Sequence, residues 1–91
     1  MAKKKITESI LLEAETIVNG ERQSKYGPPA EHWGRVCAVY NALTDHGMDE
    51  EEAMLFMLCL KLVREGFNPQ RDNLVDICGY AEIKSRISEG R

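Results

Sequence analysis

The stretch that decides the fold is Arg71-Asp72-Asn73-Leu74-Val75-Asp76-Ile77-Cys78-Gly79-Tyr80-Ala81, an apolar run with a carboxylate, Asp76, inside it. As a helix, it places Asp72, Asp76 and Tyr80 four residues apart on one stripe, with Asn73 beside them. The neighbouring face carries Leu74, Ile77, Cys78 and Ala81. Because an unpaired buried charge is costly, the sequence predicts that Asp76 meets a cation, a metal ion or a ligand.

Helical periodicity extends through the rest of the chain. We expect a first helix over 8–18, capped by Thr7 and stopped by Asn19-Gly20. Pro29 is placed to open a second helix, over 30–43, with one face made of Trp33, Val36, Cys37, Tyr40 and Leu43. A third helix starts at a capping box formed by Asp49 and Glu52, and Gly66 is expected to cap its end. The decisive stretch then begins the fourth helix, over 71–87.

These patterns predict an all-α fold, a compact four-helix domain in which residues 1–91 form a single unit. A domain of this length buries only about 60–65% of its unfolded surface, so we expect a homo-oligomer, a dimer or tetramer. The third helix is apolar on every side from Ala53 to Leu60. We therefore expect protein all around it, either at the centre of the domain or at an oligomer interface.

Composition narrows the classes of partner. The formal net charge of −3 argues against binding to duplex nucleic acid. No apolar run reaches the ~20 residues that span a bilayer, and no apolar signal core follows the lysines near the start. We therefore expect no membrane partner and a cytoplasmic location. Cys37, Cys59 and Cys78 are odd in number and widely spaced, which predicts buried free thiols without a metal or a disulfide.

One candidate site joins the third and fourth helices, where Lys61 and Arg64 could face Asp72, Asn73 and Asp76 across an antiparallel pair. In one interpretation these side chains form an ion-pair network that fastens the two helices together. In the other the cations bind phosphate, which arginine can grip with two parallel hydrogen bonds. The two interpretations are compatible, because a network that positions cations can also support a ligand.

A second candidate is the segment 21–29, which lacks periodicity and which we expect to be a loop. Arg22, Gln23, Lys25 and Tyr26 lie in it, and such side chains can stack on a base and bind phosphates. The alternative is a structural loop in which Tyr26 packs on the bundle and Arg22 pairs with an acid. The two histidines stand apart from any cysteine or second histidine, so metal binding and covalent catalysis have little support.

Two of these segments resemble the motifs of a family of small phage-encoded proteins of undefined function. Its members share an Arg-Gln-x-x-Tyr-Gly-x-Pro segment near the start and a Val-Asp-Ile-x-Gly-Tyr-Ala helix near the end. Here the motifs are Arg22-Gln23-Ser24-Lys25-Tyr26-Gly27-Pro28-Pro29 and Val75-Asp76-Ile77-Cys78-Gly79-Tyr80-Ala81. This resemblance spans roughly residues 10–87 and implies the cytoplasm of a phage host as the location.

More distantly, the pattern is similar to the all-α MazG-like nucleoside triphosphate pyrophosphohydrolases and to a phage nucleotide-modification-associated domain. MazG-like enzymes hold Mg²⁺ with Glu-x-x-Glu on one helix and Glu-x-x-Asp on the next. This resemblance places Lys61-x-x-Arg64 and Asn73-x-x-Asp76 at those positions. Two acids are thereby replaced by two cations, which implies a site that takes phosphates directly, without a metal or another cofactor.

The leading hypothesis is therefore a non-catalytic phage protein that binds a nucleotide, and that sequesters a cyclic nucleotide signal of host immunity as small phage sponge proteins do. One alternative is a Mg²⁺-dependent pyrophosphohydrolase using Asp72, Asp76 and acids from 50–52. Another is a protein-binding module built on the third helix and the tyrosine segment. The predicted ligand-binding residues are Arg22, Gln23, Lys25, Tyr26, Trp33, Lys61, Arg64, Asn73, Asp76 and Tyr80.

Overall fold

Helices make up almost all of the structure, a computed structural model that describes residues 8–90. No strand occurs within that range, which confirms the predicted all-α class. The elements in chain order are α1 (Ile10–Ile17), the π-helical segment η1 (Val18–Arg22), α2 (Gln23–Tyr26), α3 (Pro29–Thr44), α4 (Glu50–Phe67) and α5 (Arg71–Glu89). Since α1, η1 and α2 follow one another without a break, the described chain folds as four helical rods.

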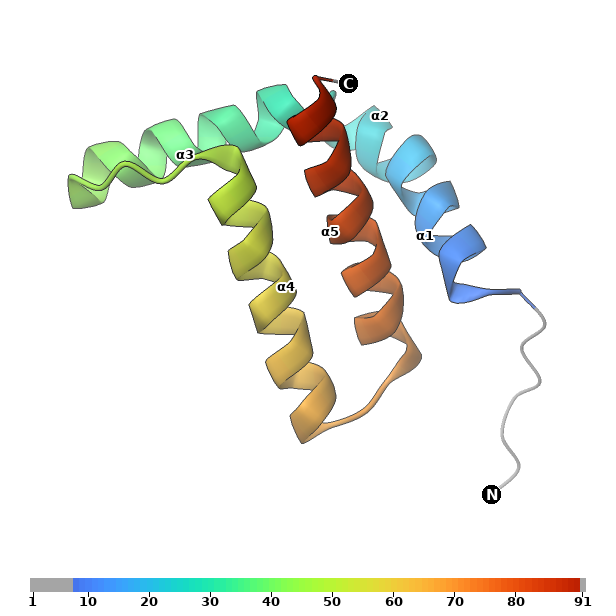
Figure 1. Cartoon of the computed structure of the whole chain (residues 1–91). Coiled ribbons are helices and arrows are strands. Elements are labelled where there is room, and N and C mark those ends of the chain that lie inside the picture. The colour runs from blue at the N-terminus through green and yellow to red at the C-terminus, as the bar shows by residue number, and fades with distance from the viewer. Residues whose placement is uncertain (1–7, 91) are drawn as a thin grey trace.

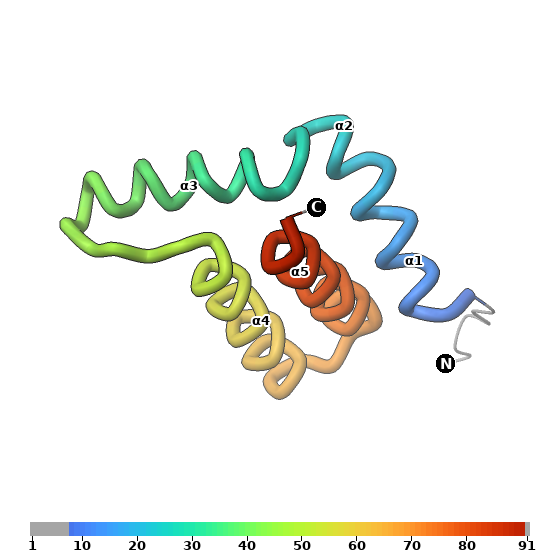
Figure 2. Tube along the Cα trace, turned by 45° about the horizontal axis from the view of Figure 1, so that its top comes forward, coloured from blue at the N-terminus to red at the C-terminus, as the bar shows by residue number. Residues whose placement is uncertain are grey.

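Helix α5 is the element against which the others pack (Figure 1). It lies between α4 on one side and α1 on the other, while α3 crosses the end of the bundle (Figure 2). A short connection makes α4 and α5 antiparallel, whereas α1 runs in the same direction as α5. The stretch around Asp76 therefore belongs to the central helix. None of the helices in the described range is long and apolar enough to cross a membrane.

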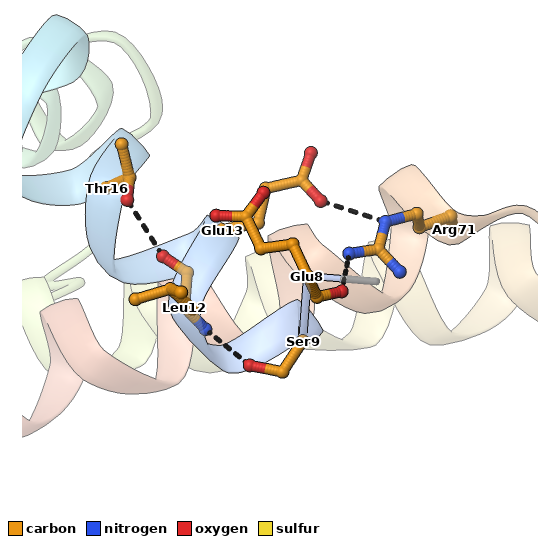
Figure 3. Close-up of polar contacts among 6 residues, drawn as sticks. All are labelled: Glu8, Ser9, Leu12, Glu13, Thr16 and Arg71. Carbon is orange, nitrogen blue, oxygen red and sulfur yellow. Dashed lines mark hydrogen bonds and ion pairs between the residues drawn. The ribbon is translucent and has the colours of Figure 1, made fainter. Parts of the chain in front are cut away.

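The starts of α1 and α5 are held together by Arg71 (Figure 3). Its Nε donates to Glu13 Oε2 at 2.8 Å, and its Nη2 donates to the carbonyl oxygen of Glu8 at 2.7 Å. The N-cap of α1 is Ser9, whose hydroxyl accepts from the amide of Leu12 at 3.1 Å. The predicted cap, Thr7, lies outside the described residues.

The predicted stop at Asn19-Gly20 is wrong, because the first rod continues through η1 and α2 to Tyr26. Val18 is buried in the core, and Arg22, one turn later, binds a side chain of α5. These two tertiary contacts outweigh the roughly 1 kcal/mol that a glycine costs inside a helix. The rod ends instead at Gly27, which has a φ of 77°. The segment 21–29 is consequently not the loop that we expected, and most of it is helical.

Helix α3 begins at Pro29 as predicted and ends where Asp45 adopts the left-handed conformation with a φ of 59°. The side chain of Asn41 then bridges the turn, since its Oδ1 accepts from the Met48 amide and its Nδ2 donates to the Met48 carbonyl, both at 2.9 Å. The predicted inner face is only half correct. Trp33 and Cys37 are buried, whereas Val36, Tyr40 and Leu43 are exposed.

Helix α4 starts as predicted, with Asp49 Oδ1 accepting from the Glu52 amide at 2.8 Å. The predicted stop at Gly66 is wrong, because the helix includes that glycine and reaches Phe67. It ends at Asn68, whose φ of −145° and ψ of 89° lie outside the helical region that a following proline, here Pro69, disfavours. A central position for α4 is also wrong, since its outward side chains are exposed in the single chain.

The core lies where α3, α4 and α5 meet the start of η1. On α5 the innermost residues are Val75, Gly79, Tyr80 and Ile83, whereas Leu74 and Ala81 of the predicted apolar face are exposed. The start of η1 lies close to this face, since a Cβ added at Gly79 would lie 3.6 Å from Val18 Cγ2. The connected core consists of Val18, Trp33, Cys37, Ala53, Met54, Tyr80 and Ile83.

The three cysteines differ in exposure, although all are free thiols. Cys37 is buried as predicted, Cys78 is partly buried, and Cys59 is exposed, so the prediction for Cys59 is wrong. Burial raises the pKa of the Cys37 thiol, and the acidic first turn of α4 raises it further. Cys37 therefore stays protonated and unreactive at neutral pH, and Cys59 is the accessible thiol.

Candidate functional site

The guanidinium of Arg22 lies between two tyrosines. Its Nη2 donates to the Tyr80 hydroxyl at 3.1 Å, and its central carbon lies 5.1 Å from the centre of that ring and 5.6 Å from the centre of the Tyr26 ring. Both ring distances fall within the range of cation–π attraction. The first rod, continued through η1 and α2, thus places Arg22 against the central helix, and within residues 8–90 it forms no ion pair with an acid.

Four aromatic rings, each next to the following one in space, lie beside that guanidinium. The ring centroids of Tyr26 and His32 are 5.0 Å apart, those of His32 and Trp33 are 5.2 Å apart, and those of Trp33 and Tyr80 are 6.3 Å apart. Trp33 and Tyr80 are buried, whereas Tyr26 is 49% exposed. We call these five residues the Arg22 cluster. Its open side is therefore the edge formed by Tyr26 and His32.

His32 is the member of the cluster that the sequence did not indicate. Partial burial lowers the pKa of its imidazole, and the nearby cations Arg22 and Arg35 lower it further. The ring is consequently neutral at physiological pH and suited to stacking. Its position follows from Pro29, because a helix that starts there turns the side chain at 32 back toward Tyr26.

Helices α4 and α5 join through an ion pair between Lys61 and Asp76. Lys61 Nζ lies 2.8 Å from Asp76 Oδ2, and only 14% of the lysine side chain is exposed. The prediction that a cation meets Asp76 is confirmed. Asp76 lies one turn before Tyr80, and Arg22, Asp76 and Tyr80 line the same small hollow. The two predicted sites therefore meet on one stripe of α5.

Arg64 lies one turn after Lys61 on α4, and Asn73 lies one turn before Asp76 on α5, so both are nearer to the α4–α5 connection. They share an open hollow of about 380 Å³ with Val63, Phe67, Asn68 and Gln70. The Asn73 amide nitrogen donates to Glu65 Oε1 at 3.2 Å and to the Asn68 carbonyl at 3.3 Å. Arg64 is exposed and forms no ion pair with the residues that the structure describes. Its guanidinium is available to a ligand.

Of the two remaining predicted residues, one stands apart from these groups and the other borders the Arg22 cluster. Lys25 pairs with Glu21 on the surface at 2.9 Å, and hydrogen bonding to that carboxylate raises the pKa of the lysine. Gln23 lines a second small hollow beside Tyr26 and Trp33. The structure therefore does not bring Lys25 to the stripe on α5.

The acids of the hydrolase alternative are not brought together. Glu51 pairs with Lys84 at 3.3 Å and accepts from the Ser88 hydroxyl, and these contacts lower the pKa of its carboxyl group. Lys84 is twelve residues along α5 from Asp72, which is about 18 Å in a helix. Within residues 8–90 no three side chains of the metal-binding types gather into a cluster.

The hollows beside the Arg22 cluster are small. The two that it lines measure about 10 Å³ each, which is room for about one water molecule. A small-molecule site usually occupies about 300–1,000 Å³. Three open surface hollows of the described residues reach that size, and the one at Arg64 is among them.

Comparison with protein families identifies a match over residues 9–88, to the domain of unknown function DUF6378. The chain belongs to this family. The match covers both candidate motifs and all four helical rods. No solved structure matches the chain.

Two relatives of this DUF6378 protein are phage proteins, each called Gene 55 protein. That of Mycobacterium phage D29 is 31% identical over 85 residues, which cover 92% of this chain and 56% of the relative. That of Mycobacterium phage L5 is 33% identical over 84 residues, covering 87% of this chain and 52% of the relative. The chain thus spans about half the length of these relatives. The predicted membership in a phage-encoded family of undefined function is confirmed.

Proposed function

We propose that this protein binds a nucleotide without a metal ion and without turning it over, and that it sequesters a cyclic nucleotide signal of host immunity. Tight binding without turnover lowers the free concentration of a signal in proportion to the amount of protein. The proposal places the phosphates at the α4–α5 cations and a base at the open edge of the Arg22 cluster.

The observation that carries this proposal is the register of α4 against α5. Lys61 lies opposite Asp76, and Arg64 shares a hollow with Asn73, three residues further in each direction. This is the pairing expected if Lys61-x-x-Arg64 and Asn73-x-x-Asp76 stand where MazG-like enzymes place their acids. The ammonium of Lys61 already neutralises Asp76, and Arg64 adds a positive charge. That charge balance favours direct binding of phosphate.

The Arg22 cluster supports the base-binding part of the proposal. Tyr26 presents an exposed ring beside the neutral ring of His32, and stacking on such rings contributes about 1–3 kcal/mol per base. Asn73 and Tyr80 are seven residues apart on one stripe of α5, about 10 Å along the helix.

The experiment is calorimetric titration with cyclic mononucleotides, cyclic dinucleotides and nucleoside triphosphates in the presence of EDTA. We expect heat from at least one cyclic nucleotide. Arg64→Ala should weaken that binding by about tenfold or more, since it removes charge-assisted hydrogen bonds. The matched control is Lys84→Ala, which removes a cation of α5 that pairs with Glu51 and lies in neither proposed group. Absence of heat across the panel overturns the proposal, as does equal affinity of the two variants.

The alternative function is a Mg²⁺-dependent pyrophosphohydrolase, which the position of Asn73-x-x-Asp76 on α5 favours through the same resemblance. It predicts release of pyrophosphate from a nucleoside triphosphate when Mg²⁺ or Mn²⁺ is added. Chromatography of each triphosphate after incubation at high protein concentration distinguishes the two. Unchanged triphosphate excludes the hydrolase.

A further inference from the structure

Helix α4 carries an apolar stripe along the side that faces away from α5. Five large side chains in it are between 54% and 91% exposed, and the thiol of Cys59 and Gly66 lie among them. The outward stripe consists of Glu52, Leu55, Phe56, Cys59, Leu62, Val63, Gly66 and Phe67. The opposite side of the same helix is used within the chain, since Ala53 and Met54 are buried there. Helix α4 thus has two packing faces, and one is open.

The spacing of the stripe is that of a helix-pairing seam. Its members recur at intervals of three and four residues over the whole 18-residue helix. The small residues Cys59 and Gly66 alternate along it with the larger Leu55 and Leu62, which permits close approach of another helix. The sequence of α4 is apolar on every side because this outward stripe adds to the apolar side that is buried within the chain.

The exposed area is large for a chain that stands alone. The five large side chains together expose roughly 600–700 Å² of mostly apolar surface, above the usual 300–600 Å² of the largest patch on a monomer. A stable dimer buries about 800 Å² on each partner. Two copies of this stripe therefore supply nearly the whole interface that a dimer needs.

We propose that α4 pairs with α4 of a second copy of this chain, antiparallel across a twofold axis that passes near Cys59. A twofold axis pairs the same surface with itself, so a seam whose large side chains are apolar from Leu55 to Phe67 is self-complementary. The middle of the stripe, which runs from 52 to 67, falls at Cys59 and Leu60. Phe56 of one copy then meets Val63 of the other.

The charges at the ends of the stripe fit the antiparallel direction. Three glutamates form the first turn of α4, and Arg64 lies in its last turn. Antiparallel pairing keeps the two acidic first turns apart and opposes the two helix dipoles. Parallel pairing instead brings the two acidic turns together, where like charges repel.

The test measures the mass of the full chain in solution by light scattering over a range of concentrations, with helicity checked by circular dichroism. We expect twice the chain mass of 10.3 kDa, or a multiple built from that dimer. Leu62→Glu should halve the mass without loss of helicity, because that side chain is 58% exposed in the single chain. Phe56→Ser tests the same seam without adding a charge. The matched control, Leu12→Glu, changes a similarly exposed leucine on α1 and should leave the mass unchanged.

The direction of pairing is tested with engineered cysteines in the Cys59→Ser background, joined by a mild oxidant. Antiparallel pairing places position 56 against position 63 of the other copy, so Phe56→Cys/Val63→Cys should form covalent dimers, whereas Phe56→Cys alone should not. A wild-type chain that stays at 10.3 kDa overturns the proposal, as does an unchanged mass of Leu62→Glu and Phe56→Ser. Covalent dimers from Phe56→Cys alone, or none from the double variant, overturn the antiparallel register.

Discussion

Replacement of Lys61 by methionine is the sharpest test of the α4–α5 packing. Methionine preserves most of the length and apolar stem of the lysine and removes its ammonium group. The Asp76 carboxylate then loses the charge that lies 2.8 Å away. Because 39% of the aspartate side chain is exposed, water can replace part of that interaction.

The expected loss in the free energy of unfolding lies between the values for exposed and buried ion pairs. Exposed pairs contribute about 0–1 kcal/mol, and removal of one partner of a buried pair costs about 3–5 kcal/mol. With the lysine 14% exposed and the aspartate 39% exposed, we expect Lys61→Met to lower the free energy of unfolding by about 1–2 kcal/mol. In a domain of this size that corresponds to a fall in melting temperature of about 5–12 °C.

The assay is urea unfolding followed by circular dichroism at neutral pH. The matched control is Lys84→Met, which breaks the more exposed pair with Glu51 at 3.3 Å and should cost less stability, because water replaces an exposed ion pair. A double-mutant cycle with Asp76→Asn should return a coupling energy of about 1 kcal/mol. A loss for Lys61→Met no larger than that of the control refutes the reasoning, and so does a coupling energy near zero.

Three further predictions concern single positions. Gly27→Ala should destabilise the fold by about 1–3 kcal/mol in the same urea assay, because the backbone there has φ 77° and ψ −168° and no steric clash is involved. Asp49→Ala should cost about 1 kcal/mol by leaving the amide of Glu52 without its cap, whereas Asp49→Asn should cost much less. The pKa of His32 is lower in the folded protein than in the unfolded chain, so folding favours the neutral imidazole. This contribution to stability is complete above the ordinary histidine pKa and is lost as the pH falls through the lowered pKa. A titration followed by NMR should find that pKa below the usual range and find it raised in Arg22→Gln, and a histidine that titrates normally in both proteins contradicts the account.

Local signals in the sequence were sufficient for most helix starts and for the pairing across α5. Proline at the start of α3, the aspartate cap of α4 and the periodic run after Pro69 act within a few residues. The carboxylate at 76 required a partner because it stands in an apolar run, and Lys61 was the nearest cation on an antiparallel neighbour. These features could therefore be predicted without knowledge of the tertiary structure.

The errors arose where contacts distant in sequence outweighed local preference. Asn19-Gly20 is a strong local stop, yet burial of Val18 and the bond from Arg22 to Tyr80 keep the first rod helical beyond it. Periodicity also could not say which side of α4 faces the chain, because both sides are apolar. The exposure of Cys59 follows from that choice and could not be read from its neighbours.

The central claim is that the protein holds an intact nucleotide without a metal ion. Native mass spectrometry of the protein, mixed with the nucleotide panel in EDTA, tests it most directly, because it gives the masses of both the complex and the released ligand. The account predicts a complex heavier than the free protein by the mass of one or more intact cyclic nucleotides, and release of the same nucleotide on denaturation. A spectrum with no complex for any member of the panel, or with only cleaved nucleotide released, contradicts it.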